Sequence, residues 1–322
     1  MRRQSTRRKT TMLARVKQYL AHRRSLGFAL RHSGLVLMDF GRYADRIRHR
    51  GPLTTELALR WASSGKEHTR RYQSARLSMV RGFARYLAAR DGKSQIPEGK
   101  LLTGNYRRQQ PHVYTERQLR DLLTAAAKLA PVYALRPESY RTLFGLLAAT
   151  GLRISEALRL RQDEVDLQSG VVRVSQTKFC KSRLVPMHST VTRAMRRYAA
   201  ARDCDPSAKG SECFFVGRCG RPLPYNTVQA TFRRICRQLG WRSNGVLPRP
   251  RIHDLRHTFA CRRMLLWHRQ GVEVDRAITS LSTYMGHGKV TDTYWYLRGT
   301  GELLSIAGSR FEQFALSEGR GR

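Results

Sequence analysis

The stretch from Arg251 to Tyr296 opens with RIHDLRHTFA, residues 251–260, and closes with MGHGKVTDTYWY, residues 285–296. Positions three and four apart share one face of a helix, so a helical HDLRH segment would direct His253 with Arg256, or His253 with His257, toward one point. A guanidinium group can hold two phosphate oxygens and stays charged at any working pH. A nearby imidazole can donate or shuttle a proton. The segment therefore predicts a helix with one face that suits a phosphate.

The second half of this stretch supplies a candidate nucleophile. Tyr296 lies nine residues beyond His287, and a phenol can attack a phosphodiester when surrounding cations manage its ionisation. Tyr294 is the rival nucleophile. Two side chains that are two positions apart on a helix point in different directions, so only one of the two tyrosines can face the arginines.

Two upstream segments carry further charged side chains. ATGLRISEALRL, residues 149–160, lies within residues 139–167, which are predicted as two helical segments with a break near Gly151. This break places Arg153 at the start of a helix, where free amide hydrogens favour phosphate oxygens. The alternative is a surface arginine that pairs with Glu156. VVRVSQTKFCKSRLVPM, residues 171–187, alternates apolar and polar residues on both sides of a short connection, which predicts a β-hairpin with lysine near its tip.

These four motifs, in their order along the chain, resemble those of the tyrosine recombinase family, the phage-integrase type of site-specific DNA recombinase. The resemblance covers about residues 113–315 and extends only loosely to the region before them. It implies six catalytic residues, with Tyr296 as the nucleophile, and one supporting acid: Arg153, Lys178, His253, Arg256, His287 and Tyr296, supported by Glu156.

The choice of catalytic lysine stays open. Lys178 matches the family's lysine by its place before the second basic cluster. Relatives carry a glycine beside that lysine, whereas this chain has Phe179 and Cys180. Lys181 therefore competes with Lys178 for the role of proton donor to the departing sugar oxygen.

The length of 322 residues exceeds the usual ceiling for one core, so two domains are expected. The predicted fold class is mainly α with a small β-hairpin or sheet (α+β): a helical core-binding domain that contacts DNA, then a catalytic domain. The predicted boundaries are a basic arm at 1–10, the helical domain at 11–90, a linker at 91–112 and the catalytic domain at 113–322. The apolar residues of 302–315 recur at helical spacing. In the family such a segment packs onto a neighbouring protomer, and packing within the chain is the alternative.

Charge points to the partner. Lysine and arginine total 61 against 23 acids, a net charge of +38. An excess of this size implies a polyanion, and nucleic acid fits best because phosphate neutralisation supplies sequence-independent binding energy. Charge alone leaves RNA open. No apolar run is long enough to span a membrane, and the six cysteines lack the paired spacing of a zinc site.

The sequence thus predicts a site-specific recombinase that cuts and rejoins DNA through a 3′-phosphotyrosine intermediate, with no metal and no cofactor. Its expected partners are double-stranded DNA carrying specific recombination sites, further copies of itself (a dimer to tetramer on DNA) and sister recombinases. Its expected location is the cytoplasm, at the nucleoid. A relaxing enzyme of the type IB topoisomerase kind and a non-catalytic DNA-binding relative are the alternatives. A metal-dependent transposase or nuclease would need several carboxylates around its ions, and acids are scarce here.

Overall fold

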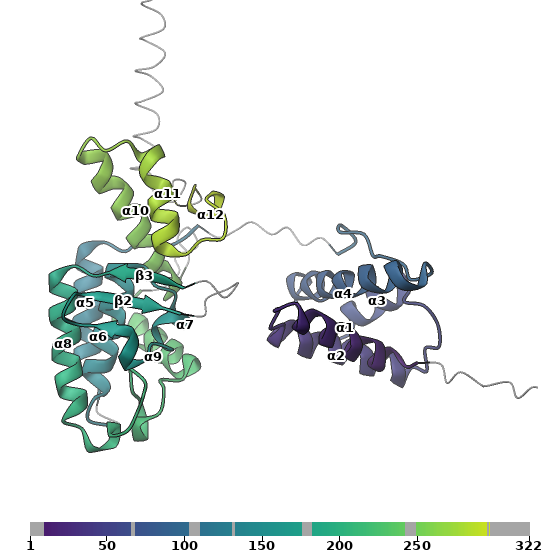
Figure 1. Cartoon of the computed structure of the whole chain (residues 1–322), viewed down its shortest axis with the longest axis horizontal. Coiled ribbons are helices and arrows are strands. Elements are labelled where there is room, and N and C mark those ends of the chain that lie inside the picture. Colours follow the sequence, from purple (N-terminus) through teal and green to yellow (C-terminus); the bar gives the residue numbers. More distant parts are fainter. Residues whose placement is uncertain are drawn as a thin grey trace, which may run out of the picture. The chain divides into compact units, whose positions relative to one another are not determined.

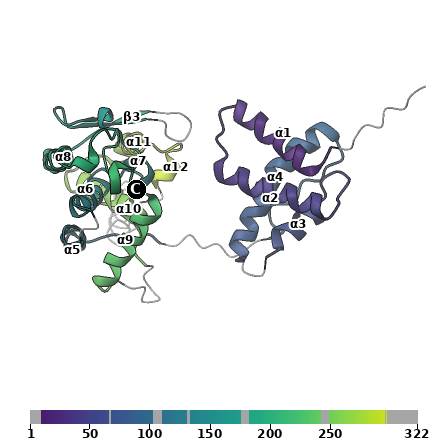
Figure 2. The same cartoon turned by 90° about the horizontal axis from the view of Figure 1, so that it is seen from below.

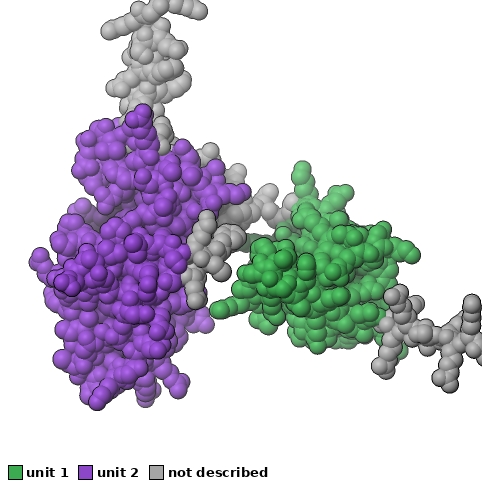
Figure 3. Space-filling model, viewed as in Figure 1, with its two compact units in different colours: residues 1–108 green, residues 109–322 purple. Residues whose placement is uncertain are grey.

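The computed structural model describes residues 10–65, 68–102, 110–130, 133–175, 182–241, 249–294 and 296. The chain divides into two compact units, Met1–Arg108 and Gln109–Arg322 (Figure 3). Each unit has a hydrophobic core of its own.

The first unit contains four helices in its described part (Figure 1). They are α1 (Met12–Ser25), α2 (Arg31–Arg46), α3 (Thr55–Ser63) and α4 (Arg70–Asp91). The side chains of Thr11, Thr54 and Thr69 accept hydrogen bonds from backbone amides in the first turns of α1, α3 and α4, so these three helices begin at N-caps of a preferred type. Phe40 and Trp61 meet edge to face in the core between the helices.

Residues that follow α4 still pack on the first unit. The amide of Gln95 donates to the carbonyl of Leu53 at 2.8 Å, and the Gln95 side chain accepts from the amide of Thr55. Leu102 is buried in the same core. The start of the region predicted as a linker, 91–102, is therefore held against α3 and α4, and residues 103–109 lie outside the described ranges.

The second unit is mainly helical, as Figures 1 and 2 show. Its α-helices are α5 (Glu116–Ala127), α6 (Arg136–Thr150), α7 (Ile154–Ala157), α8 (Ser189–Asp203), α9 (Tyr225–Gln238), α10 (His253–Arg269), α11 (Val274–Met285) and α12 (Thr291–Tyr294), and its short 3-10 helices are η1 (Gln162–Glu164), η2 (Pro206–Ala208) and η3 (Arg218–Gly220). Thr115 and Gln118 form the capping box of α5. Aromatic and leucine side chains of α6, α9 and α10 fill the core, among them Phe144 and Phe232.

A small antiparallel sheet lies over the helices of the second unit. Its order is β1-β2-β3, from Val165–Asp166, Val171–Val174 and Arg183–Pro186. Val172 pairs with Val185, and both are fully buried. The register sets Arg183 opposite Val174 at the end of the ladder nearest the hairpin connection. The predicted hairpin and the predicted α+β fold class are confirmed. Both candidate lysines, Lys178 and Lys181, lie outside the described residues.

The segment from Cys213 to Cys219 forms two isolated bridges and enters the 3-10 helix η3 rather than a regular strand. Phe214 and Phe215 are both buried. Successive residues of a half-exposed strand face opposite sides, so burial of both rings favours an irregular backbone here.

No helix in the described part of the chain is both long enough and apolar enough to cross a bilayer.

Candidate active site

Arg153 is placed by a backbone break at Gly151. Gly151 has φ of +63°, and a Cβ there would lie 2.6 Å from the ring of Phe259. Helix α6 therefore ends at a position that only glycine fits. Arg153 follows as the N-cap of the single-turn helix α7, in agreement with the predicted break. Its side chain is one-third exposed.

Glu156 is the anchor of Arg153. It accepts hydrogen bonds from the backbone amide of Arg153 at 3.0 Å and from its Nη1 at 2.8 Å. Arg183 binds the same carboxylate through Nη1 at 3.2 Å and Nη2 at 2.8 Å. Burial alone would raise the pKa of Glu156, but the hydrogen bonds and charge of Arg183, helped by Arg153, lower it to about 2. Glu156 is therefore ionised at neutral pH although its side chain is only 3% exposed.

Arg256 lies three residues into α10 and is 2% exposed. Its Nη1 donates to the carbonyl of Gly151 at 2.6 Å and its Nη2 to the carbonyl of Met285 at 2.8 Å. Burial lowers the pKa of Arg256 to about 10, so the guanidinium stays charged near neutral pH. These two bonds tie the start of α10 to the ends of α6 and α11.

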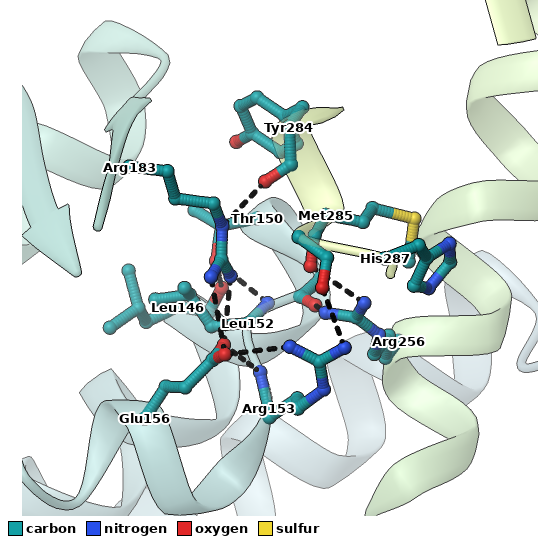
Figure 4. Close-up of polar contacts among 12 residues, drawn as sticks. Leu146, Thr150, Leu152, Arg153, Glu156, Arg183, Arg256, Tyr284, Met285 and His287 are labelled. Carbon is teal, nitrogen blue, oxygen red and sulfur yellow. Dashed lines mark hydrogen bonds and ion pairs between the residues drawn. The ribbon is translucent and has the colours of Figure 1, made fainter. Parts of the chain in front are cut away.

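Three successive backbone carbonyls at the end of α11 accept from three different arginines, and Figure 4 shows Tyr284 and Met285 beside those arginines. The carbonyl of Tyr284 accepts from Arg183 Nε at 2.8 Å, and that of Met285 from Arg256. The carbonyl of Gly286 accepts from Arg153 Nη2 at 2.8 Å. We call residues 284–286 the carbonyl turn. It gathers three guanidinium groups from distant parts of the sequence around one point.

The carbonyl turn leads directly to His287. Its Nδ1 lies 2.6 Å from Oγ1 of the buried Thr293, and its Nε2 lies 3.3 Å from the hydroxyl of Tyr296. The rings of His287 and Tyr296 are stacked at 5.7 Å. Burial, with smaller contributions from Arg256 and Arg153, lowers the pKa of His287 to about 4. The imidazole is therefore neutral at pH 7.

The structure separates the two candidate nucleophiles. Tyr296 is 3% exposed and belongs to the core cluster of α10 and α11, whereas Tyr294, the last residue of α12, is 42% exposed. The ring of His257 packs at 4.9 Å from Tyr296 and at 4.9 Å from His253. His257 thus lies between the two other side chains and belongs to the site.

His253 is the first residue of α10. Burial, and then the positive charge of Arg256, lowers the pKa of His253 to about 4. A cavity of about 780 Å³ opens beside it, and its lining includes Arg233, Arg249, Ile154, Arg251 and His253. The cavity extends the positive surroundings of the site along α9.

Arg183 is the site residue that the sequence interpretation missed. Its position in KSRLVP resembles any polar residue of a half-exposed strand, and its carboxylate partner lies 27 residues earlier. The signal available was the register of the hairpin, because Arg183 stands opposite a buried valine rather than an exposed residue. Of the predicted residues, five meet here with Glu156, namely Arg153, His253, Arg256, His287 and Tyr296.

No group of three or more histidine, cysteine, aspartate or glutamate side chains close enough for a metal ion occurs among the described residues.

A helical unit followed by a mainly α unit, in which arginines, histidines and one buried tyrosine converge, defines a DNA breaking-rejoining enzyme of the tyrosine type. The model of the phage integrase family matches residues 112–301, and this chain belongs to that family. It is a site-specific DNA recombinase.

The relatives agree over most of the chain. A protein of Sinorhizobium fredii named as an integrase/recombinase, y4rB, is 38% identical over 310 residues, which covers 94% of this chain and 98% of the relative. The tyrosine recombinase XerD of Xanthomonas campestris is 30% identical over 246 residues, 74% of this chain and 70% of the relative. The integrase of the Tn1549 transposon, solved with a circular intermediate DNA, is similar in fold: the TM-score is 0.68 at 19% identity, over 94% of this chain and 99% of that one.

Proposed function

We propose that Tyr296 is the nucleophile of this recombinase and that the arginines around the carbonyl turn bind the phosphate it attacks. The observation that supports this most directly is the contact of 3.3 Å between the Tyr296 hydroxyl and His287 Nε2, in a buried cluster that also holds Arg256. The proposed substrate is double-stranded DNA.

The phosphate is held by charge. Arg153 and Arg256 bind its non-bridging oxygens and stabilise the extra negative charge of the pentacovalent transition state. Both guanidinium groups are already fixed by backbone carbonyls and Glu156, so little reorganisation is needed when the charge develops. These cations fill the role that metal ions fill in other phosphoryl-transfer enzymes, and the reaction needs neither a metal nor a nucleotide cofactor.

The cleavage step forms one bond to phosphorus, breaks one and moves two protons. The phenolic oxygen of Tyr296 forms a bond to phosphorus, and the bond from phosphorus to the 5′ oxygen of the next nucleotide breaks. The neutral His287, whose Nδ1 faces Thr293, receives the phenolic proton at Nε2. His253 hydrogen-bonds a phosphate oxygen. Lys178, or its competitor Lys181, protonates the departing 5′ oxygen. Attack by a 5′-hydroxyl of another strand reverses these steps and completes strand exchange.

The assembly follows from the stoichiometry. One tyrosine attacks one strand, and exchange between two duplexes cuts four strands. We therefore propose an oligomer on DNA, a dimer to tetramer, with further copies of this chain or sister recombinases as subunits. The similar transposon integrase was solved in complex with DNA. The net charge of +38 supports a DNA partner, and we place the protein at the nucleoid, in the cytoplasm.

The domain roles are part of the same proposal. The first unit, α1 to α4, is the core-binding domain, and residues 113–322 are the catalytic domain. Residues 302–315 lie outside the described ranges. A measurement of subunit assembly on DNA would distinguish packing on a neighbouring protomer from packing within the chain.

The test uses a trapped intermediate. DNA that flanks the gene in its host genome is prepared as duplexes with a nick just beyond each candidate cleavage position, so that the short fragment diffuses away after cleavage. The full chain should form an adduct that survives denaturant, also in excess chelator, and Tyr296→Phe should form none. Adduct formation that requires a divalent metal, or an adduct at normal yield with Tyr296→Phe, would contradict the proposal. Relaxation of a supercoiled plasmid that lacks these sites would instead indicate a topoisomerase.

A further inference from the structure

We infer that Arg183 is a positioning residue for the cleavage reaction: it neutralises Glu156 and fixes the carbonyl turn, and thereby keeps Arg153 available for the phosphate. The inference rests on the proposed function of Arg153. Arg183 is 30 residues from Arg153 in sequence and sits on a different element, β3.

Arg183 offsets the charge of Glu156 more completely than Arg153 does. Arg183 donates to both carboxylate oxygens of Glu156, whereas Arg153 reaches them through one guanidinium nitrogen and its backbone amide. A carboxylate held in two places by Arg183 has its charge offset by that guanidinium. Among the described residues, Arg153 and Arg183 are the cationic side chains paired with Glu156, so without Arg183 that pairing would fall to Arg153 alone. The buried carboxylate would then compete with the phosphate for the same guanidinium.

The side chains of Arg183 and Arg153 differ in their exposure to solvent. The Arg183 side chain is 11% exposed and the Arg153 side chain 33% exposed. Figure 4 shows the two guanidinium groups approaching the Glu156 carboxylate from different directions, with that of Arg153 on the side of Arg256. The two arginines therefore have different roles. Arg183 pairs with the Glu156 carboxylate, and the more exposed Arg153 binds the DNA phosphate.

Arg183 also contacts the carbonyl turn. Arg183 Nε binds the carbonyl of Tyr284, and a Cβ at Gly286 would lie 2.6 Å from Arg183 Nη1. The turn thus lies directly against the Arg183 side chain. Because the next residue along the chain is His287, a shift of Arg183 would move His287 together with the carbonyls that hold Arg153 and Arg256. Loss of Arg183 should therefore disturb both phosphate charge stabilisation and the His287 contact to Tyr296.

The experiment compares Arg183→Lys and Arg183→Met with a matched control, Arg202→Lys. Arg202, in α8, is also buried, with its side chain 5% exposed, and it binds Asp203 and the carbonyl of Phe214. The control therefore loses a buried guanidinium of the same unit without touching the site. Single-turnover adduct formation is measured on the nicked duplex with an ordinary scissile phosphate and on one with a neutral methylphosphonate, which needs less charge stabilisation at its phosphorus.

We expect Arg183→Met to slow adduct formation on the phosphate by about a hundredfold, the size typical of a misplaced catalytic group. Arg183→Lys should lie between it and the wild type, because lysine restores the charge but cannot also bind Tyr284. On the methylphosphonate, the deficit of both variants should shrink severalfold. Arg202→Lys should keep the wild-type rate on both substrates even if its melting temperature falls.

Two results would overturn the inference: a rate for Arg183→Lys equal to that of Arg202→Lys, or the same deficit on both substrates. If Arg183→Met does not fold, Arg183→Lys decides alone. If the wild-type chain forms no adduct on either substrate, the proposed function has failed, which is a different outcome from failure of the inference.

Discussion

Glu156 binds Arg153 twice, once through its backbone amide and once through its guanidinium group. The first bond closes the first turn of α7, and the second orients the side chain. One carboxylate therefore couples the backbone break at Gly151 to the direction in which Arg153 points.

Replacement of Glu156 by glutamine should destabilise the chain. Glutamine keeps the shape but leaves the largely buried guanidinium of Arg183 without its countercharge, and breaking a buried pair in this way costs about 3 kcal/mol or more. Urea unfolding at pH 7 measures the change. Glu212→Gln is the control, because Glu212 pairs with Arg161 at the surface with a side chain that is 72% exposed, and surface pairs contribute little. Equal stability of Glu156→Gln and the wild type would contradict this role.

The low pKa of Glu156 also predicts how stability depends on acid. A carboxyl whose folded pKa is about 2, below its ordinary value of 4.5, stabilises the fold fully above pH 4.5 and loses that contribution as pH falls toward 2. A series of unfolding measurements should show the wild type losing more stability across this window than Glu156→Gln. Parallel curves for the two proteins would mean that Glu156 is not the group that titrates.

The cleavage step should be insensitive to pH near the ordinary histidine pKa of 6.5. His253 and His287 both have a pKa of about 4 because they are buried near arginines. With these lowered pKa values, the neutral rings dominate above about pH 5. The contribution of the two histidines to the stability of the fold is complete above pH 6.5 and is lost as pH falls toward 4. Single-turnover rates from about pH 7.5 down to about pH 5.5 should change little on their account. An inflection near 6.5 that Ala substitution at either histidine removes would contradict this.

The contact between Thr293 and His287 should orient the imidazole. Thr293→Val removes the hydroxyl that lies 2.6 Å from Nδ1 while keeping the shape. One lost hydrogen bond is worth about 1 kcal/mol, so adduct formation should slow by about tenfold or somewhat less. Thr283→Val is the matched control, since its hydroxyl binds only the carbonyl of Thr279 within α11. Equal rates for the two variants would show that Thr293 does not serve the site.

Gly286→Ala tests the close packing of the carbonyl turn on Arg183. Gly286 and Gly271 both have positive φ, +70° and +71°, but only at Gly286 would a Cβ meet a neighbour. Both alanine variants carry the backbone cost of the left-handed region, about 1 kcal/mol. Gly286→Ala should lose more stability in thermal unfolding and should also slow adduct formation, whereas Gly271→Ala should cleave at the wild-type rate. Similar losses in the two variants would argue against the packing.

Much of the fold could be predicted because the signals are local. The helices of the first unit follow apolar residues at three and four positions, and Thr115 marks the start of α5 as an N-cap does. Gly151 marks the break before Arg153 for a steric reason that one residue type satisfies. The burial of Tyr296 and the exposure of Tyr294 could not be predicted, because α12 ends at Tyr294 and Tyr296 lies beyond it. Helical spacing says nothing about such a residue.

The hydrogen-bond network of Arg153, Arg183 and Arg256 could not be predicted from the sequence, for a different reason. Its bonds run from β3 to α7 and from α10 to the end of α6, and Arg153, Arg183 and Arg256 each bind the carbonyl turn. The bonded residues are 27 to 133 positions apart in the sequence. Most acceptors are backbone carbonyls, and these are present at every residue. The residue types of Tyr284, Met285 and Gly286 do not predict that three guanidinium groups bind their carbonyls.

The most direct test of the account is the position of the DNA on the protein. The trapped wild-type adduct is digested with nuclease and trypsin, and the peptide VTDTYWYLR, residues 290–298, is fragmented in a mass spectrometer. The account predicts a nucleotide phosphate attached to Tyr296 and none on Tyr294. Attachment to Tyr294, or to a residue outside this peptide, would contradict it.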